Sequence, residues 1–118
     1  MNYFLYLSSC DTCKRIIAEL PLTQDVEMID IKKNPITKNQ LTDLHQANGS
    51  YVELINKRAQ LFKKRQIDTQ NISEETAKKL LLEHYTFLKR PVLVYQNRVF
   101  IGNSKATVAE AKNWLDEH

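Results

Sequence analysis

The chain lacks the features of membrane, exported and multidomain proteins. Its longest apolar runs are only a few residues, as in Val92-Leu93-Val94, whereas a membrane-spanning helix needs about 18. The first seven residues are apolar but have neither the basic leader nor the cleavage pattern of a secretory signal. No repeat or linker divides the 118 residues, a length typical of one domain. We therefore expect a single compact, soluble, cytoplasmic domain that is a monomer and has no membrane partner.

Cysteine is scarce, and its placement is informative. Cys10 and Cys13 are separated by two residues, and a disulfide that closes so short a loop removes little entropy from the unfolded chain. In a chain without a secretory signal, this spacing indicates redox chemistry or metal binding. A zinc site needs two further soft ligands, and the three histidines, His45, His84 and His118, are not paired at ligand spacing. We predict no metal, while a pair of inert, buried cysteines stays an open alternative.

Charge is nearly balanced over the whole chain but not locally. The net charge of +3 is too small to indicate general affinity for nucleic acid. A cluster of basic residues nevertheless lies in the middle of the chain: Lys57, Arg58, Lys63, Lys64 and Arg65. The cluster is interpreted either as a solvated helix face or as a surface that binds an anion or a partner.

The first third of the sequence predicts a strand, a helix and a second strand. Residues 3–7 are aromatic and apolar, and Ser8-Ser9 then indicates a turn. Between Thr12 and Leu20 apolar residues recur at spacings of three and four, which predicts an amphipathic helix closed by Pro21. Residues 26–31 alternate as a strand does. Such a βαβ unit favours two parallel strands with a right-handed crossover.

The middle of the chain is predicted to be mainly helical. The expected helices run from a cap at Thr37 to about His45, around residues 51–55, around residues 61–62, and from Ser73 to about Tyr85. After them, residues 92–95 and 98–101 predict a hairpin around Gln96-Asn97. A closing helix then has the apolar face Val108, Ala111, Trp114 and Leu115. Residues 33–87 would thus interrupt the two sheet-forming ends of the chain.

The predicted position of Cys10 favours a reactive thiolate. At the start of a helix, unpaired backbone N–H groups and the positive end of the dipole stabilise negative charge. Lys14 and Arg15 follow directly and would add positive charge within reach. We therefore predict that Cys10 is the nucleophile. Cys13, one turn later, would resolve a mixed disulfide formed on Cys10.

Several segments together resemble the ArsC/Spx/YffB family of thioredoxin-like proteins. They are Cys10-Asp11-Thr12-Cys13-Lys14, Leu54-Ile55-Asn56-Lys57-Arg58, Leu88-Lys89-Arg90-Pro91-Val92-Leu93-Val94 and Val99-Phe100-Ile101-Gly102. The resemblance implies an α/β thioredoxin-like fold, with βαβ and ββα halves separated by a helical insertion at about 33–87 within a single domain, 1–118. From the sequence alone Pro91 would be an ordinary trans proline, but the resemblance implies a structural cis proline that faces the cysteines.

The family also suggests how an anion would be held. Its arsenate reductases use one cysteine and three arginines, and the carry-over places the cysteine at Cys10 and one arginine at Arg90. Asn56 and Ile101 occupy the other two arginine positions, and Asn56-x-Arg58 is more similar to the YffB and Spx branches. These substitutions favour a substrate other than arsenate.

The sequence therefore predicts a thiol-disulfide oxidoreductase of the ArsC family. Cys10 and Cys13 would be catalytic, and the substrate or anion would be bound by Arg90, Arg58, Lys14 and Asn56. We expect no bound cofactor, a small thiol, disulfide or oxyanion substrate, and glutathione or a redox protein such as thioredoxin or glutaredoxin as electron donor. The alternatives are an Spx-type redox-sensing regulator that binds the RNA polymerase alpha subunit, with Gly49 matching a family glycine, and an arsenate reductase.

Overall fold

The computed structural model describes residues 2–118, which form two compact units. The residues up to Asn34 together with Arg90–His118 make the first, which we call the sheet unit. Pro35–Lys89 make the second, the helical unit. That the whole chain acts as one domain stays a prediction. Within the described residues, the helices are too short or too polar to cross a membrane.

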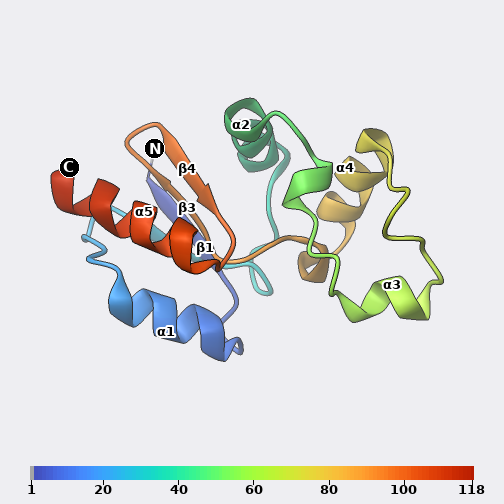
Figure 1. The fold of residues 1–118 in the computed structure, drawn as a ribbon, viewed down its shortest axis with the longest axis horizontal. Coiled ribbons are helices and arrows are strands. Elements are labelled where there is room, and N and C mark those ends of the chain that lie inside the picture. The colour runs from blue at the N-terminus through green and yellow to red at the C-terminus, as the bar shows by residue number, and fades with distance from the viewer. Residues whose placement is uncertain (1) are drawn as a thin grey trace. The chain divides into compact units, whose positions relative to one another are not determined.

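The sheet unit contains a four-stranded sheet in the order β2-β1-β3-β4. Its strands are β1 (Tyr3–Tyr6), β2 (Glu27–Asp30), β3 (Val92–Tyr95) and β4 (Arg98–Ile101). β1 pairs with β2 in parallel, whereas β1–β3 and β3–β4 are antiparallel. The predicted α/β thioredoxin-like architecture, with a parallel pair from the first third of the chain and a hairpin from the last, is confirmed (Figure 1).

The hairpin between β3 and β4 turns at the two residues that the sequence indicated. Gln96 and Asn97 have φ angles of 49° and 66°. Two successive left-handed residues are typical of the tight type I′ turn, whose twist matches that of the flanking strands. Asn2 also stabilises the turn, because its Oδ1 accepts a hydrogen bond of 3.0 Å from the Gln96 N–H.

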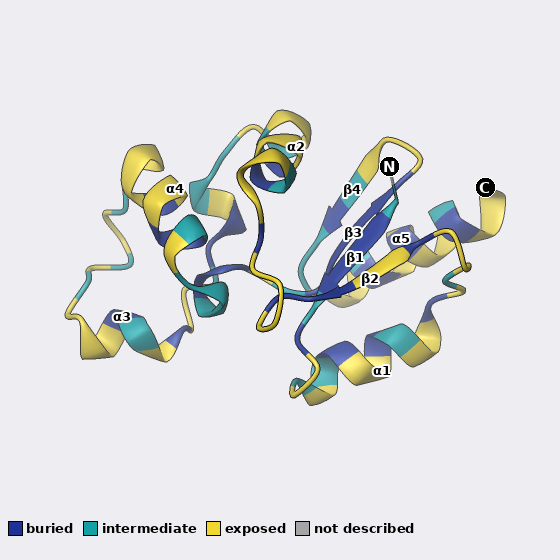
Figure 2. Ribbon diagram, turned by 180° about the vertical axis from the view of Figure 1, so that it is seen from behind, coloured by how far each residue is buried: buried dark blue, intermediate teal, exposed yellow. Residues whose placement is uncertain are grey.

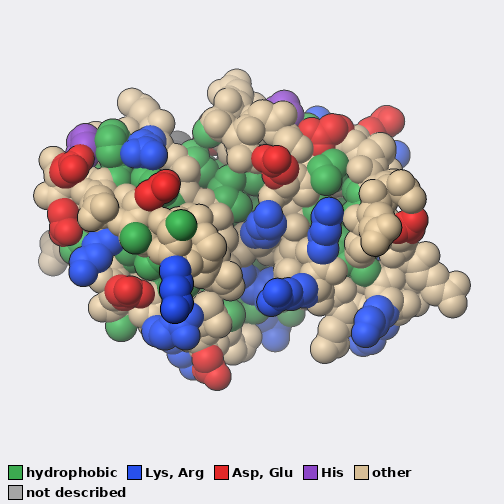
Figure 3. All heavy atoms as spheres, viewed as in Figure 1, with side chains coloured by type: hydrophobic (Ala, Val, Ile, Leu, Met, Phe, Trp, Pro, Cys, Tyr) green, Lys and Arg blue, Asp and Glu red, His purple; other side chains and the backbone are tan. Residues whose placement is uncertain are grey.

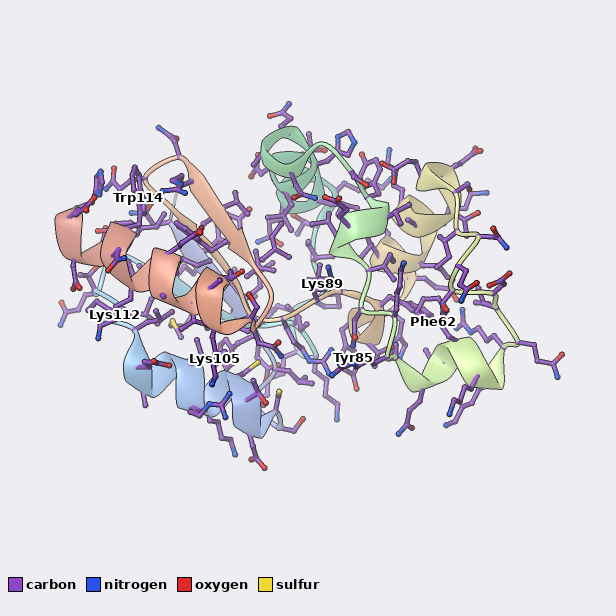
Figure 4. The ribbon with its side chains drawn as sticks, viewed as in Figure 1. Phe62, Tyr85, Lys89, Lys105, Lys112 and Trp114 are labelled. Atoms are coloured by element: carbon purple, nitrogen blue, oxygen red, sulfur yellow. The ribbon has the colours of Figure 1, made fainter. Side chains whose placement is uncertain are left out.

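Helices α1 (Asp11–Glu19) and α5 (Lys105–Glu117) pack on the sheet of this unit. Their inward residues join strand residues in one apolar core: Phe4, Ile16, Leu20, Val26, Leu93, Tyr95, Phe100, Val108, Ala111 and Leu115. Figure 2 shows β1 and β3 buried while the outer surfaces of α1 and α5 are exposed. Trp114, predicted to be core, lies instead at its edge, because its indole N–H reaches the Tyr95 carbonyl at 2.8 Å (Figure 4).

The helical unit is built from short helices with clear start and stop signals. They are α2 (Lys38–Asn48), the 3₁₀ turn η1 (Val52–Leu54), α3 (Gln60–Lys64), α4 (Glu74–Glu83) and the 3₁₀ turn η2 (Tyr85–Phe87). Thr37 and Gln40 form a capping box at the start of α2, and Ser73 caps α4. The predicted end of α2 at His45 is three residues too early, because the helix continues until Gly49 adopts a left-handed conformation, φ 84°.

Phe87 is fully buried in the helical unit. The Phe87 ring meets Phe62 of α3, labelled in Figure 4, edge to face with 5.0 Å between ring centroids. The Phe87 carbonyl accepts a 2.7 Å hydrogen bond from the Asn56 N–H, and Ile55 pairs with Leu88 in an isolated β-bridge. These contacts fix the segment that contains Asn56 and Arg58 against the segment that ends at Lys89.

Candidate active site

Cys10 lies between a tight turn and the first residue of a helix. The turn follows β1, and its closing hydrogen bond runs from the Cys10 N–H to the Leu7 carbonyl at 3.0 Å. Helix α1 begins at Asp11, so Cys10 is the N-cap residue, in an extended conformation (φ −92°, ψ 115°). The predicted position at the helix start is correct, although the helix starts one residue before Thr12. The amide N–H groups of the first turn of α1 are therefore available to the sulfur.

The surroundings of Cys10 stabilise its thiolate. Burial on its own would raise the pKa of the half-buried thiol. The backbone N–H and the thiol of Cys13 and the backbone N–H of Thr12 donate hydrogen bonds to it, and Arg90 adds a positive charge. Together these interactions hold the pKa of Cys10 below its ordinary value. This is the electrostatic condition that a nucleophilic cysteine needs near neutral pH.

Cys13 has the opposite character. Its side chain is completely buried (0% exposed), and burial, together with the hydrogen bond and charge of Cys10, raises the pKa of Cys13 to about 11. The N–H of Leu7 and the charge of Arg90 counteract this rise only in part. At neutral pH Cys13 is thus a thiol that donates to its neighbour. Two cysteines three positions apart are thus chemically distinct.

Arg90 is brought to the cysteines by the start of β3. It is half-buried, its Nε atom is fully buried, and its charge acts on both thiols. The peptide bond from Arg90 to the buried Pro91 is cis, the isomer that the family resemblance implies. The Pro91 carbonyl accepts a 2.9 Å hydrogen bond from the Gly102 N–H, which ties it to the end of β4.

Lys14 and Arg15, expected to add positive charge near Cys10, lie on the exposed side of α1. Both are exposed on α1, where Figure 3 shows basic side chains over the helix. We expected their charge to act on Cys10, but the strongest cationic influence on that thiol is Arg90. Lys14 and Arg15 are long, solvated side chains, and their effect on Cys10 stays a prediction. A role of Lys14 in binding substrate stays a prediction.

Asn56 and Arg58 belong to the helical unit. The Asn56 side chain accepts a 3.2 Å hydrogen bond from the Arg58 N–H and donates one of 3.4 Å to the Thr86 carbonyl. Arg58 is exposed and, with Lys57 and Lys63, lines a hollow of about 570 Å³. A positively charged hollow suits an anion. Their participation in a site with Cys10 stays a prediction.

The sequence did not indicate one further residue of this region, Asp30. It stands at the end of β2 with 7% of its surface exposed, and its carboxylate accepts a 2.7 Å hydrogen bond from the Ser8 hydroxyl. Ser8 is in the turn before Cys10. The available signal was an acidic residue within the predicted strand of residues 26–31, which alone does not predict burial. No group of three or more His, Cys, Asp or Glu side chains in residues 2–118 is arranged to hold a metal ion.

Comparison with known proteins agrees with this geometry. A model of the ArsC family matches residues 5–111. The chain belongs to the ArsC family. Within curated proteins, the global transcriptional regulator Spx 2 of Bacillus anthracis is 29% identical over 97 residues, which cover 80% of this chain and 74% of the regulator. The relatives of this chain thus include a protein named as a transcriptional regulator.

Solved structures of ArsC-type proteins share the fold. A possible arsenate reductase from Streptococcus mutans is 28% identical, with a TM-score of 0.70 over 89% of this chain and 92% of its own. An arsenate reductase from Vibrio cholerae is only 16% identical but has a TM-score of 0.76, covering 93% and 96%. The second likeness shows the thioredoxin-like fold and not a shared substrate.

Proposed function

We propose that this ArsC-family protein is a thiol-disulfide oxidoreductase in which Cys10 attacks and Cys13 resolves. The observation that carries the proposal is the contrast between the two thiols, a half-buried Cys10 whose pKa is lowered and a buried Cys13 whose pKa is raised to about 11. Exposure and a low pKa make a thiol a nucleophile towards disulfides in solution, whereas a buried, protonated thiol reacts only with a disulfide that forms next to it.

The reaction transfers two electrons from the protein to the substrate. The Cys10 thiolate attacks one sulfur of a disulfide, so that a Cys10–substrate disulfide forms and the other half leaves as a thiolate, which takes a proton from water. Cys13 then loses its proton to solvent and attacks Cys10. The Cys10–Cys13 disulfide forms and the second half of the substrate leaves as a thiol. Glutathione, thioredoxin or glutaredoxin would reduce the protein again.

Arg90 is proposed to serve both protein and substrate. Its charge stabilises the Cys10 thiolate, and its guanidinium suits a carboxylate or oxyanion, which it can bind through two parallel hydrogen bonds. A glutathione carboxylate placed there would bring its sulfur towards Cys10. Arg58, Asn56 and Lys14 are proposed as further anion-binding residues.

The test is turnover of bis(2-hydroxyethyl) disulfide with glutathione and, separately, with thioredoxin as donor. Cys10→Ser should abolish turnover with either donor. Cys13→Ser should retain attack on the substrate and accumulate a mixed disulfide on Cys10 that is visible by mass spectrometry. Full turnover by Cys10→Ser would refute the proposal.

A redox-sensing regulator is the second candidate, and its support is the 29% identity to the Spx regulators of Bacillus anthracis and Streptococcus agalactiae. Here the Cys10–Cys13 disulfide would control binding to the RNA polymerase alpha subunit. A pull-down with the oxidised and the reduced protein tests this, and absence of polymerase from both would remove the candidate. Arsenate reduction, the third candidate, can be measured in the same glutathione assay with arsenate as substrate.

A further inference from the structure

Asp30 is the buried charged residue of the described chain, and the proposed reaction gives it no task. It is the last residue of β2 and pairs with Tyr6, the last residue of β1, in the parallel register. Asp30 thus stands at the edge of the sheet where the chain leaves β1 for Cys10. Burying a carboxylate costs free energy unless several hydrogen-bond donors compensate it. The donors to Asp30 therefore show which segments its carboxylate fixes in place.

The donors come from the segments that follow β1 and β2. From the first, the Ser8 hydroxyl donates at 2.7 Å and the Ser8 N–H also bonds to the carboxylate. From the second, the Lys32 N–H donates at 3.1 Å. The Asp30 carbonyl accepts two more bonds, from the N–H groups of Lys33 (3.1 Å) and Asn34 (2.8 Å). The Ser8 hydroxyl lowers the pKa of the Asp30 carboxyl most, burial opposes this, and the N–H groups of Lys32 and Ser8 and the charge of Lys33 lower it further, so that it lies below its ordinary value.

Ser8 is a corner residue of the turn that presents the nucleophile. The turn runs from Leu7 to Cys10 and is closed by the 3.0 Å hydrogen bond between these two residues. Both ends of the turn interact with the thiols. At the first end the Leu7 N–H donates a hydrogen bond to Cys13, and at the other the Cys10 sulfur accepts hydrogen bonds from the first amides of α1. A displacement of Ser8 would therefore change the positions of both sulfur atoms.

We propose that Asp30 is a positioning residue for the thiol pair: its carboxylate holds Ser8, and through Ser8 the Leu7–Cys10 turn, so that the Cys10 sulfur faces the amides of Thr12 and Cys13. This inference rests on the proposed function for its catalytic meaning. It concerns the geometry of the site and requires no contact between Asp30 and the substrate.

The direction in which the pKa of Cys10 changes when Asp30 is substituted distinguishes a positioning role from a simple effect of charge. Removing a nearby negative charge makes a thiolate easier to form and lowers the thiol pKa. Loosening the turn has the opposite effect, because the sulfur then loses hydrogen bonds that stabilise its charge. If Asp30 positions the turn, Asp30→Asn should raise the pKa of Cys10 by about one unit, a tenfold change in the ratio of thiolate to thiol.

The experiment measures the rate of Cys10 alkylation by iodoacetamide from pH 4 to 10 in the full chain, with mass spectrometry to assign the modified residue. Asp30→Asn and Ser8→Ala should both raise the pKa of Cys10, and Ser8→Thr, which restores a hydroxyl, should return it to that of the unmodified protein. The double variant should shift it no further than either single change, because both break one linkage. Ser8→Ala keeps the Asp30 charge and an exposed position, so it also tests the inference if Asp30→Asn folds poorly.

Asp25→Asn is the matched control. This carboxylate precedes β2 at its other end and accepts hydrogen bonds from Thr23 and Asn2, so the substitution makes the same charge change away from the turn. It should leave the pKa of Cys10 unchanged. An unchanged or lowered pKa in both Asp30→Asn and Ser8→Ala would overturn the positioning role. An ordinary Cys10 pKa in the unmodified protein would instead count against the proposed function, while a further rise in the variants would still support positioning.

Discussion

Converting Cys10 to a mixed disulfide should lower the pKa of Cys13 and make it a better nucleophile. Burial is the largest cause of the Cys13 pKa of about 11, but the hydrogen bond and the charge of Cys10 also raise it. A mixed disulfide on Cys10 removes both of these contributions and leaves the burial. With a pKa near 11, roughly 1 in 10⁴ Cys13 side chains is a thiolate at pH 7, and each unit by which the pKa falls raises that fraction about tenfold.

The assay begins with the Cys10 methyl disulfide, prepared with one equivalent of methyl methanethiosulfonate at pH 6, where Cys10 is the better nucleophile. Attack by Cys13 releases methanethiol and leaves the internal disulfide, which mass spectrometry of acid-quenched samples follows directly. The rate should rise about tenfold per pH unit between pH 7 and 9, because only the thiolate attacks. The Cys13→Ser protein should release nothing. A rate that does not change over this range would show that Cys13 is already ionised at pH 7 and would refute the assignment.

Three further predictions concern the site and the stability of the helical unit. Arg90→Ala should raise the pKa of Cys10, measured by alkylation, whereas Arg90→Lys keeps the charge and should raise it less. Phe87→Ala should lower the free energy of unfolding in urea by about 3–5 kcal/mol, because Phe87 is 0% exposed and packs on Phe62. Glu74 accepts N–H hydrogen bonds, the strongest from Val52, that lower its pKa. Its contribution to stability is therefore present above the unfolded pKa and lost as the pH falls through the folded one, and Glu74→Gln should lack this acid-dependent loss in urea titrations between pH 3 and 7.

Features that depend on neighbouring residues could be predicted from the sequence. The caps at Thr37 and Ser73 are local hydrogen bonds with the N–H groups three residues on, and the hairpin turn depends on the left-handed tolerance of Asn97. The position of Cys10 at the start of α1 could also be predicted locally, because an apolar strand, a serine turn and an amphipathic helical pattern follow one another in the sequence around it. The end of α2 was missed because Asn48 continues the helix until Gly49 ends it.

Features that depend on tertiary structure could not be predicted. Lys14 is four residues from Cys10 and Arg90 is eighty, yet the more distant residue acts on the thiol because β3 begins beside it. Asp30 is an acidic member of an alternating strand in the sequence, and its burial becomes possible through hydrogen bonds that include one from Ser8, the residue that follows the neighbouring parallel strand by two positions. Local patterns contain no information about such pairings.

The pKa of Cys10 tests the central claim most directly. It is measured as the pH dependence of alkylation in the reduced, unmodified protein, with Cys13→Ser to confirm that a single thiol reacts. The account predicts a midpoint below the ordinary value of about 8.5, with Cys10 modified long before Cys13. A midpoint at or above that value, or equal modification of both cysteines, would contradict it and favour a pair of inert structural thiols.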